Sequence, residues 1–511
     1  MIMAGERPLV CKRVKSVRFS MVAVSVMIMV VLFGCAVGPD FQTPKAPVTK
    51  AYTAEALPAK TDAAPGTAGA SQRFAPGKDI PQEWWTLLQS AELDQLIRQA
   101  LAESPTVAAA KARLREADEN RRAQYGALFP AVDANISASR QKISGAGFGQ
   151  PDSDISVFNL YNASVNVSYS PDLFSGTRRK LEALQSQIDY QRFQLEGVYL
   201  TLTANIVTTA VKDASLRAQI GAMREIIEAQ EKQLAVVEEQ LHLGGASRSD
   251  VLAQRAQLAQ TQALLPPLEK QLAQTRHQLA VLAGRLPSEA ALPEFDLNDF
   301  QLPEELPVSL PSLLVRQRPD IRAAEETLHA ASAQVGVATA NLYPQITLTG
   351  SFGLEASTVG DFFNSGAAIW SLSAGLLQPI FHGGALTAQR RAAIAVYDQA
   401  AAQYRDTVLQ AFQSVADVLR ALAGDASTLK AQAEAEAAAR DTLDLTEKQF
   451  QLGAVSYLSL LNAERQHEQA RLALVQAQAA RFADTAALYQ ALGGGWWNRS
   501  PQAEAAAIKP E

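Results

Sequence analysis

The chain has 511 residues and a formal net charge of −6. An acidic chain of this kind lacks the basic surface that binding to nucleic acid requires. Its five histidines form no H-x-x-x-H or HExxH pair, and only two cysteines are present, so the sequence excludes the common zinc sites and a disulfide framework. We therefore expect no catalytic centre, no metal and no cofactor.

The first 34 residues predict a lipoprotein signal peptide. Five basic residues precede an apolar run from Met21 to Phe33, which is too short for a membrane-spanning helix. Leu32-Phe33-Gly34-Cys35 resembles the bacterial lipobox, and that resemblance implies cleavage before Cys35 and lipidation of its thiol. Ala36 in the next position favours sorting to the outer membrane in lipoproteins of this kind. Residues 1–34 contribute +4, so the mature chain would carry −10. A plain secretory signal with an incidental cysteine is the alternative.

Composition divides the remaining chain into five parts. Residues 35–80 are rich in Ala, Pro and Thr, and we expect a lipid-anchored segment that is extended along the surface. Two structural repeats follow, at 81–286 and 312–497, and a Pro-rich linker at 287–311 joins them. Residues 498–511 are expected to be disordered.

The first repeat contains a strand that leads into an unusually long helix. Apolar and polar residues alternate from Tyr161 to Tyr169, which indicates a strand with one apolar face. A helical pattern then holds from Thr177 to Leu243, about 67 residues or roughly 100 Å, whereas ordinary helices have about 8–20 residues. The turn LGGASRSD reverses the chain into a second helix at 249–284. Pro266-Pro267 is expected to interrupt and bend that second helix.

The same unit recurs in the second half of the chain. The segment QPIFHGG repeats SPDLFSG, and LGAVSYLSLL repeats LGGASRSDVL. Each half therefore reads helix, strand, loop, strand, long helix, turn, helix. The strands are predicted at 130–140, 161–171, 344–354 and 369–380, and the further helices at 105–128, 319–341, 385–452 and 457–492.

Several motifs together carry a resemblance to a known family. Cys35 to Pro44, Pro81-Gln-Glu-Trp-Trp85 and Leu93 to Val107 resemble the N-terminus of the lipoprotein branch of the TolC-like outer-membrane factors. The resemblance implies an α+β membrane protein: a homotrimer whose twelve-stranded outer-membrane β-barrel continues into a long periplasmic α-helical barrel. It also implies a passive exit duct for small molecules. The implied partners are a periplasmic adaptor protein, an inner-membrane transporter of the resistance-nodulation-division (RND) class and the lipid of the outer membrane.

The predicted strands support such a barrel independently. Single-chain outer-membrane barrels begin at about eight strands, so four strands cannot close one. An open sheet edge in lipid leaves backbone groups unpaired, and sharing the barrel among three chains removes the edges. No apolar run of 18 residues follows the signal, which leaves no candidate spanning helix. A soluble antiparallel sandwich explains the alternation equally well, but not the strands that lead into roughly 100 Å of helix.

The resemblance places the functional residues at the two turns between the long and return helices, where the family meets its adaptor and closes its tunnel. The expected adaptor-contact positions are Gly244, Ser247, Gly453 and Ser456, and their alternative role is to form the turns only. The expected periplasmic gate residues are Arg248, Asp250, Leu458, Asn462 and Arg465. Family members often carry Asp where this chain has Asn462. Alternatively, the charged residues are only solvated side chains at helix ends, where an exposed ion pair contributes only about 0–1 kcal/mol to stability.

Two other functions fit the same pattern. One is an outer-membrane duct for type I protein secretion, although the lipoprotein N-terminus favours RND efflux. The other belongs to a different class, a lipid-anchored periplasmic coiled-coil scaffold, which predicts no barrel. A heat-modifiable trimer that requires detergent would exclude the scaffold.

Overall fold

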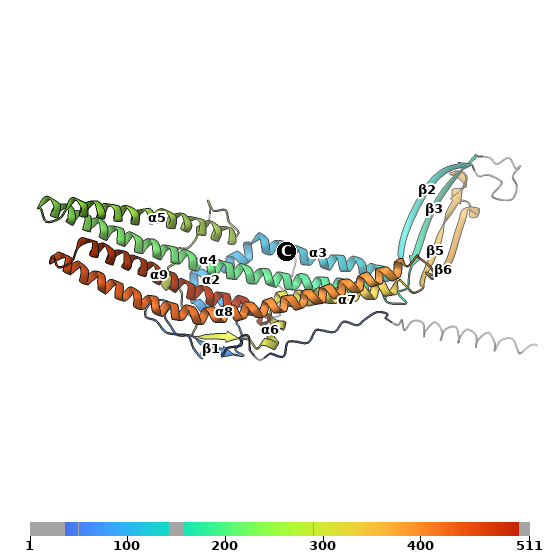
Figure 1. Cartoon of the computed structure of the whole chain (residues 1–511). Coiled ribbons are helices and arrows are strands. Elements are labelled where there is room, and N and C mark those ends of the chain that lie inside the picture. The colour runs from blue at the N-terminus through green and yellow to red at the C-terminus, as the bar shows by residue number, and fades with distance from the viewer. Residues whose placement is uncertain (1–35, 50, 143–156, 290, 500–511) are drawn as a thin grey trace, which may run out of the picture. The chain divides into compact units, whose positions relative to one another are not determined.

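The computed structural model describes residues 36–49, 51–142, 157–289 and 291–499 (Figure 1). They form two compact units. One unit contains the described residues up to Thr43 together with 116–189 and 326–402, and the other contains 44–115, 190–325 and the described residues from Gln403 onward. The signal peptide, Cys35 and the end of the tail at 500–511 lie outside the described residues.

The helices and strands repeat in order along the chain. The helices are α2 (Ala91–Glu103), α3 (Pro105–Tyr125), α4 (Gly176–His242), α5 (Arg248–Leu282), α6 (Pro311–Gln317), α7 (Pro319–Ala340), α8 (Ala385–Gln451) and α9 (Tyr457–Ala491). The strands are β1 (Arg73–Pro76), β2 (Ala131–Lys142), β3 (Val157–Tyr169), β4 (Glu305–Val308), β5 (Gln345–Ala356) and β6 (Ala368–Leu377). Both long helices, α4 and α8, contain 67 residues, and both return helices, α5 and α9, contain 35. The equal helix lengths in the two halves are consistent with the predicted duplication.

Four strands form one antiparallel sheet in the order β2-β3-β5-β6 (Figure 1). The central pair, β3 and β5, joins the two repeats, with Val165 opposite Phe352. The register keeps like residues on the same face across all four strands, because successive side chains of a strand point to opposite faces. One face carries Val132, Ala134, Ile136, Val165, Val167, Leu348, Phe352, Trp370, Leu372 and Leu376. The other carries Asp133, Asn135, Ser137, Asn162, Ser164, Asn166, Thr347, Thr349, Ser351, Ser371 and Ser373.

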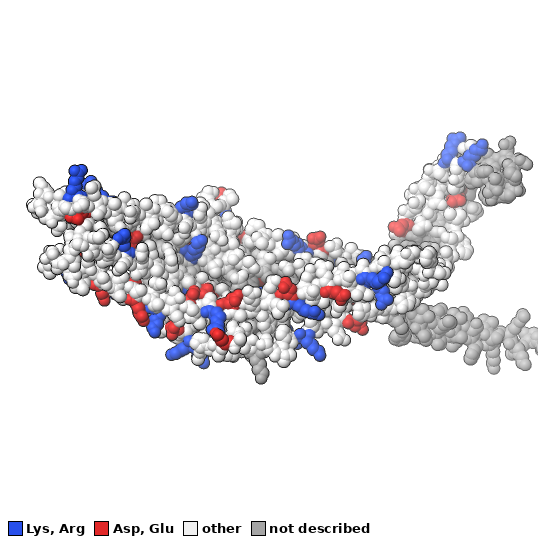
Figure 2. Space-filling model, viewed as in Figure 1, with Lys and Arg blue, Asp and Glu red and all other residues white. Residues whose placement is uncertain are grey.

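The apolar face of this sheet is exposed in the single chain. Ile136 is 86% exposed, Leu372 81% and Trp370 77%. Few charged side chains appear over the visible surface of the sheet in Figure 2. Soluble monomers rarely expose contiguous apolar patches larger than a few hundred Å². An exposed apolar face that extends across four strands therefore indicates an apolar environment or a partner.

The expected interruption of the first return helix is wrong. Helix α5 continues through Pro266 and Pro267 without a break. Each proline removes one backbone donor, which frees the carbonyl four residues earlier, at Gln262 and Ala263. All four residues are exposed, so water can satisfy the freed carbonyls. Among the described residues, no helix combines the length and the apolar character needed to cross a lipid bilayer.

The N-terminal segment and the linker between the repeats contain structure that the sequence analysis missed. Strands β1 and β4, one from each segment, pair in parallel as a second, two-stranded sheet. The segment before β1 is also attached to α9. The fully buried Arg481 donates from Nη2 to Gln72 Oε1 at 2.8 Å and to the Ala70 carbonyl at 3.2 Å. Burial lowers the pKa of Arg481. The N-terminal segment is therefore partly a packed element, not only an extended surface strand.

Candidate helix-tip site

The two turns that reverse the long helices are built alike. Gly244 has φ +80° and Gly453 has φ +71°, in the left-handed region that favours glycine at helix ends. In the first turn the Gly245 amide donates to the Gln240 carbonyl at 2.7 Å, and in the second the Ala454 amide donates to Gln449 at 2.8 Å. A Cβ at either Gly244 or Gly453 would meet no atom within 4 Å. Backbone conformation, not crowding, therefore selects glycine at these turns.

The serines after the glycines begin the return helices. Ser247 and Asp250 form a capping box at the start of α5, so two amides at the helix end are satisfied. Ser456 caps α9 less completely, since only its hydroxyl accepts, from the Ser459 amide at 3.3 Å. The carboxylate of Asp250 is thus committed to local helix capping. The predicted role of Asp250 in an acidic ring stays a prediction.

An apolar cluster fixes the two turns to each other. It combines Val237 of α4, Val251 of α5 and three residues of α9, namely Tyr457, Leu460 and Leu461. Buried Tyr457 donates from its hydroxyl to Gln254 Oε1 of α5, and burial raises the pKa of that hydroxyl. Sequence reasoning missed Tyr457. Its position next to Ser456 and the other apolar residues at the start of α9 was the available signal.

The predicted gate residues of the second turn lie on the exposed side of α9. Leu458, Asn462 and Arg465 are all exposed. Arg465 donates from Nη2 to Asn462 Oδ1, so two of the three are joined directly. Glu464 is adjacent to Arg465 in sequence, but its side chain is half-buried and faces other helices. In the first turn, Arg248 is exposed and Asp250 is half-buried.

Leucines at the turns are also exposed to solvent. Leu452 is 85% exposed, and Leu243 and Leu458 are exposed as well. Each of the two turns thus presents at least one exposed leucine. Within the described part of the chain, no three His, Cys, Asp or Glu side chains gather in a way that could hold a metal ion.

The segment that follows Cys35 is fastened to the unit that contains the sheet. Arg179 of α4 donates from Nη2 to Asp40 Oδ1 at 2.6 Å, and its side chain is nearly buried. Phe41 stacks on His329 of α7, with ring centroids 4.3 Å apart. A Cβ at Gly38 would lie 2.5 Å from the Cα of Gly336, so a glycine there permits the segment to approach α7 closely.

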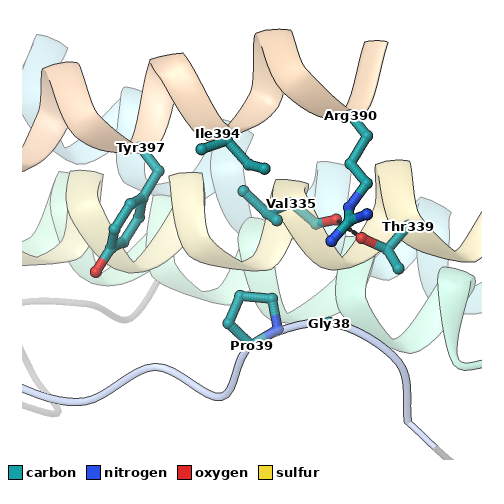
Figure 3. A pocket seen from close by; sticks show the side chains of 7 residues that line it. All are labelled: Gly38, Pro39, Val335, Thr339, Arg390, Ile394 and Tyr397. Carbon is teal, nitrogen blue, oxygen red and sulfur yellow. Dashed lines mark hydrogen bonds between the residues drawn. The ribbon is translucent and has the colours of Figure 1, made fainter. Parts of the chain in front are cut away.

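A cavity of about 460 Å³ opens beside this segment (Figure 3). Val335, Ile394 and Tyr397 give it apolar walls, whereas Arg390 and Thr339 lie together at one end. Gly38 and Pro39 of the N-terminal segment complete the lining. The residues directly after Cys35 are therefore held against α7 and α8. The lipidation of Cys35 itself lies outside the described residues.

Comparison with known proteins identifies the family. The family model described as outer membrane efflux protein matches residues 96–285 and 310–494, one stretch in each repeat. The pyoverdine export outer membrane protein OpmQ of Pseudomonas putida is 34% identical over 82% of this chain and 89% of its own length. The toluene efflux pump outer membrane protein TtgC, also of Pseudomonas putida, is 30% identical over 93% of this chain and 95% of its own length.

A solved structure agrees with these relatives. The outer-membrane channel OprN superimposes with a TM-score of 0.82 and 29% identity, over 90% of this chain and all of the solved one. Both the sequence relatives and this channel extend over nearly the whole fold described above. The chain therefore belongs to the outer membrane efflux protein family and is the outer-membrane channel component of an efflux pump.

Proposed function

We propose that three copies of this chain form a passive exit duct through the outer membrane. Solute would be delivered by an inner-membrane transporter of the RND class through a periplasmic adaptor protein. The duct itself carries out no chemistry and uses no energy source. Its relatives are named for pyoverdine export and toluene efflux. We propose small organic molecules as the solutes here too.

The antiparallel sheet carries this proposal. Its outer strands, β2 and β6, each have one edge that no other strand of the chain pairs among the described residues. Unpaired edges in lipid leave backbone donors and acceptors unsatisfied, which is unfavourable by several kcal/mol for each group. The exposed apolar face and the polar face are the two surfaces that a membrane barrel needs, one toward lipid and one toward water.

The strand directions are compatible with closure of the sheet by further copies. Strand directions alternate along the sheet, so β2 of a second copy could lie antiparallel to β6 of the first. Three copies of a four-stranded sheet give twelve strands and no free edge. Twelve strands exceed the minimum of about eight for an outer-membrane barrel. The helices of the three copies would then line the periplasmic tunnel.

We propose the helix tips as the adaptor-docking surface and the closed end of the duct. The turn residues Gly244, Ser247, Gly453 and Ser456 would contact the adaptor, and the exposed Leu243 and Leu452 support this role. Arg248, Asp250, Leu458, Asn462 and Arg465 would narrow the tunnel. Threefold symmetry repeats each of them around one axis, so few side chains suffice to form a ring. Weak links such as the Asn462–Arg465 pair can be broken by the binding energy of a partner.

We also propose that Cys35 carries the lipid anchor and that mature protein begins there. The clamp formed by Arg179, Asp40 and Phe41 supports this assignment, since it holds the residues just after Cys35 in one place. Mass spectrometry of the purified N-terminus would detect the acyl groups, and Cys35→Ser should abolish them.

The test of the duct is single-channel recording with purified protein in a planar bilayer. A heat-modifiable trimer on denaturing gels should accompany a small, mostly closed conductance. Correctly folded trimer without any conductance would overturn the duct and favour the periplasmic scaffold. Monomeric protein that remains soluble without detergent would overturn the shared barrel.

A further inference from the structure

A second, smaller cavity lies among the helices near the tips and opens to solvent at the exposed residues Glu225, Ala229 and Glu447. It has a volume of about 180 Å³ and is lined by α4, α8 and α9. The lining residues of α9 are spaced three or four positions apart, so they occupy one face of that helix. Of its lining residues, Leu460 belongs to the apolar cluster beneath the turns, and Leu443 packs against that cluster. The cavity is therefore part of the same packed region as the tips, but on the buried side of α9.

Two residues that line this cavity carry polar atoms with no protein partner. Gln230 of α4 is only 2% exposed, and neither its side-chain oxygen nor its side-chain nitrogen has a hydrogen-bond partner among the described residues. Glu464 Oε2 of α9 is also buried without a hydrogen-bond partner there. Buried amide and carboxylate groups are normally satisfied, and each exception requires an explanation. Gln230 and Glu464 together offer two unused acceptors, Gln230 Oε1 and Glu464 Oε2, and one unused donor, Gln230 Nε2.

The charges around the cavity are predominantly negative. Three carboxylates line it: Glu225, Glu447 and Glu464. Glu225 is paired with Arg471, which is the one arginine of the lining. His467 also lines the cavity, and its Nε2 lies 3.5 Å from Glu436 Oε1.

Burial and neighbouring carboxylates both raise the pKa of Glu464. Desolvation raises its pKa to about 7, and the nearby Glu447 and Glu468 add to the rise. Glu468 itself is buried on α9, where Thr261 of α5 donates to it at 3.4 Å. A positive charge in the cavity would offset the repulsion among these carboxylates.

We propose that the cavity binds a small primary alkylammonium ion, whose N–H groups donate to Glu464 and Gln230. A primary ammonium has three donors and no acceptor, which matches two orphan acceptor oxygens in a negatively charged pocket. Ile226 and Leu460 supply apolar contacts for a short alkyl chain. The volume admits a few carbon atoms and excludes a large solute. The site would thereby tie α4 to α9 behind the exposed gate residues.

The test uses the full-length trimer in detergent at pH 8, in a buffer without amines. Isothermal titration and thermal unfolding would be followed with n-propylammonium chloride. Tetramethylammonium chloride, which carries the same charge but no N–H donor, and KCl at equal ionic strength serve as controls. We expect saturable heat and a saturable rise in unfolding temperature with n-propylammonium only.

Variants connect the binding to named residues. Glu464→Gln should reduce the affinity at least tenfold, and so should Gln230→Leu. The matched control is Glu231→Gln, which neutralises an exposed carboxylate next to Gln230 that does not line the cavity. It should leave the affinity within twofold of wild type. Equal responses to both organic cations, no saturable response in wild type, or an unchanged response in folded Glu464→Gln or Gln230→Leu would overturn the site. None of these readouts depends on conductance, so the site and the duct are tested separately.

Discussion

Ser247 and Asp250 cap the start of α5 reciprocally. The Ser247 amide donates to Asp250 Oδ2 at 2.9 Å, and the Asp250 amide donates to Ser247 Oγ at 3.2 Å. The Ser247 hydroxyl also donates to the same carboxylate oxygen at 2.6 Å. The Asp250 carboxylate therefore accepts hydrogen bonds from both the amide and the hydroxyl of Ser247, in the turn that precedes a 35-residue helix. Any role of Asp250 in the tunnel is combined with this structural role.

Two substitutions at Asp250 separate charge from capping. Asp250→Asn retains an oxygen that can accept from the Ser247 amide, whereas Asp250→Ala removes it. We expect Asp250→Ala to lower the stability of the trimer by about 1 kcal/mol per chain, and Asp250→Asn by less. Denaturant unfolding measures both. Conductance then isolates the charge: a ring of carboxylates would make the two variants equally open, whereas a purely local cap would leave Asp250→Asn as closed as wild type.

Arg465→Ala should raise the open probability of the channel in planar bilayers. The substitution removes the link to Asn462 on the exposed side of α9, and Asn462→Ala should have a similar effect. Because exposed links are weak, at about 0–1 kcal/mol, we expect a several-fold change at most from either. Arg440→Ala on α8 is the matched control, since it removes another exposed arginine that lies outside the proposed gate. A comparable rise with Arg440→Ala would remove Arg465 from the gate.

Gly453→Ala and Gly424→Ala should change stability in opposite directions. Gly453 has φ +71°, and an alanine forced into that conformation is unfavourable by about 1–2 kcal/mol. Gly424 lies within α8, where an added Cβ meets no atom within 4 Å. There alanine should stabilise the helix by about 0.5–1 kcal/mol. Unfolding midpoints of the two variants give the signs directly, and a neutral Gly453→Ala would contradict the turn geometry described here.

Stability should fall with rising pH because of Glu464. Its pKa is about 7 in the folded chain against an ordinary value of 4.5, so between these values the folded state holds a proton that the unfolded state has released. The free energy of unfolding therefore decreases as pH rises from 4.5 through 7, by an amount on the order of 3 kcal/mol per chain, and then levels off.

The difference between wild type and Glu464→Gln isolates this contribution. In buffers without amines, the two should have similar stability near pH 4.5, and Glu464→Gln should become the more stable near pH 8. Thermal unfolding across this range is the measurement. Parallel curves for wild type and the variant would show that Glu464 titrates normally.

Adjacent residues of β5 should respond differently to a lysine. Phe352 belongs to the apolar face of the sheet and Ser351 to the polar face. If the apolar face contacts lipid, Phe352→Lys should destabilise the inserted trimer by about 2–4 kcal/mol near the bilayer centre, and Ser351→Lys by much less. The yield of heat-modifiable trimer in outer-membrane fractions reports both. Equal yields would mean that the two faces are not assigned correctly.

Periodic patterns predicted most of the fold from sequence. The alternation from Tyr161 to Tyr169 lies within β3, and the long helix predicted from Thr177 to Leu243 differs from α4 by one residue at each end. These signals are local, because a strand or helix places its own side chains. The matching motifs in the two halves predicted the duplication for the same reason.

Contacts between distant segments escaped the sequence analysis. The four-residue strands β1 and β4 are too short for alternation to stand out, and their pairing joins segments that are far apart in the chain. The burial of Glu464 depends on which helices lie against α9, which the composition of α9 alone does not indicate. Likewise, Pro266 and Pro267 lie within α5 because the freed carbonyls reach water. That outcome depends on the solvent exposure of the carbonyls of Gln262 and Ala263, which the presence of two prolines in the sequence does not reveal.

The central β3–β5 pair has a consequence for how this chain could have arisen. Each repeat alone supplies one hairpin, so a chain of half this length would need six copies to provide the twelve strands proposed here. Fusion of two repeats makes the middle pairing intramolecular and reduces the number of subunits that must meet to three. It also releases the two tips from being identical. One now has a full Ser247–Asp250 box, and the other has a simple Ser456 cap with an Asn462–Arg465 pair. A duplicated gene can thus specialise each tip separately, which six equal copies could not do.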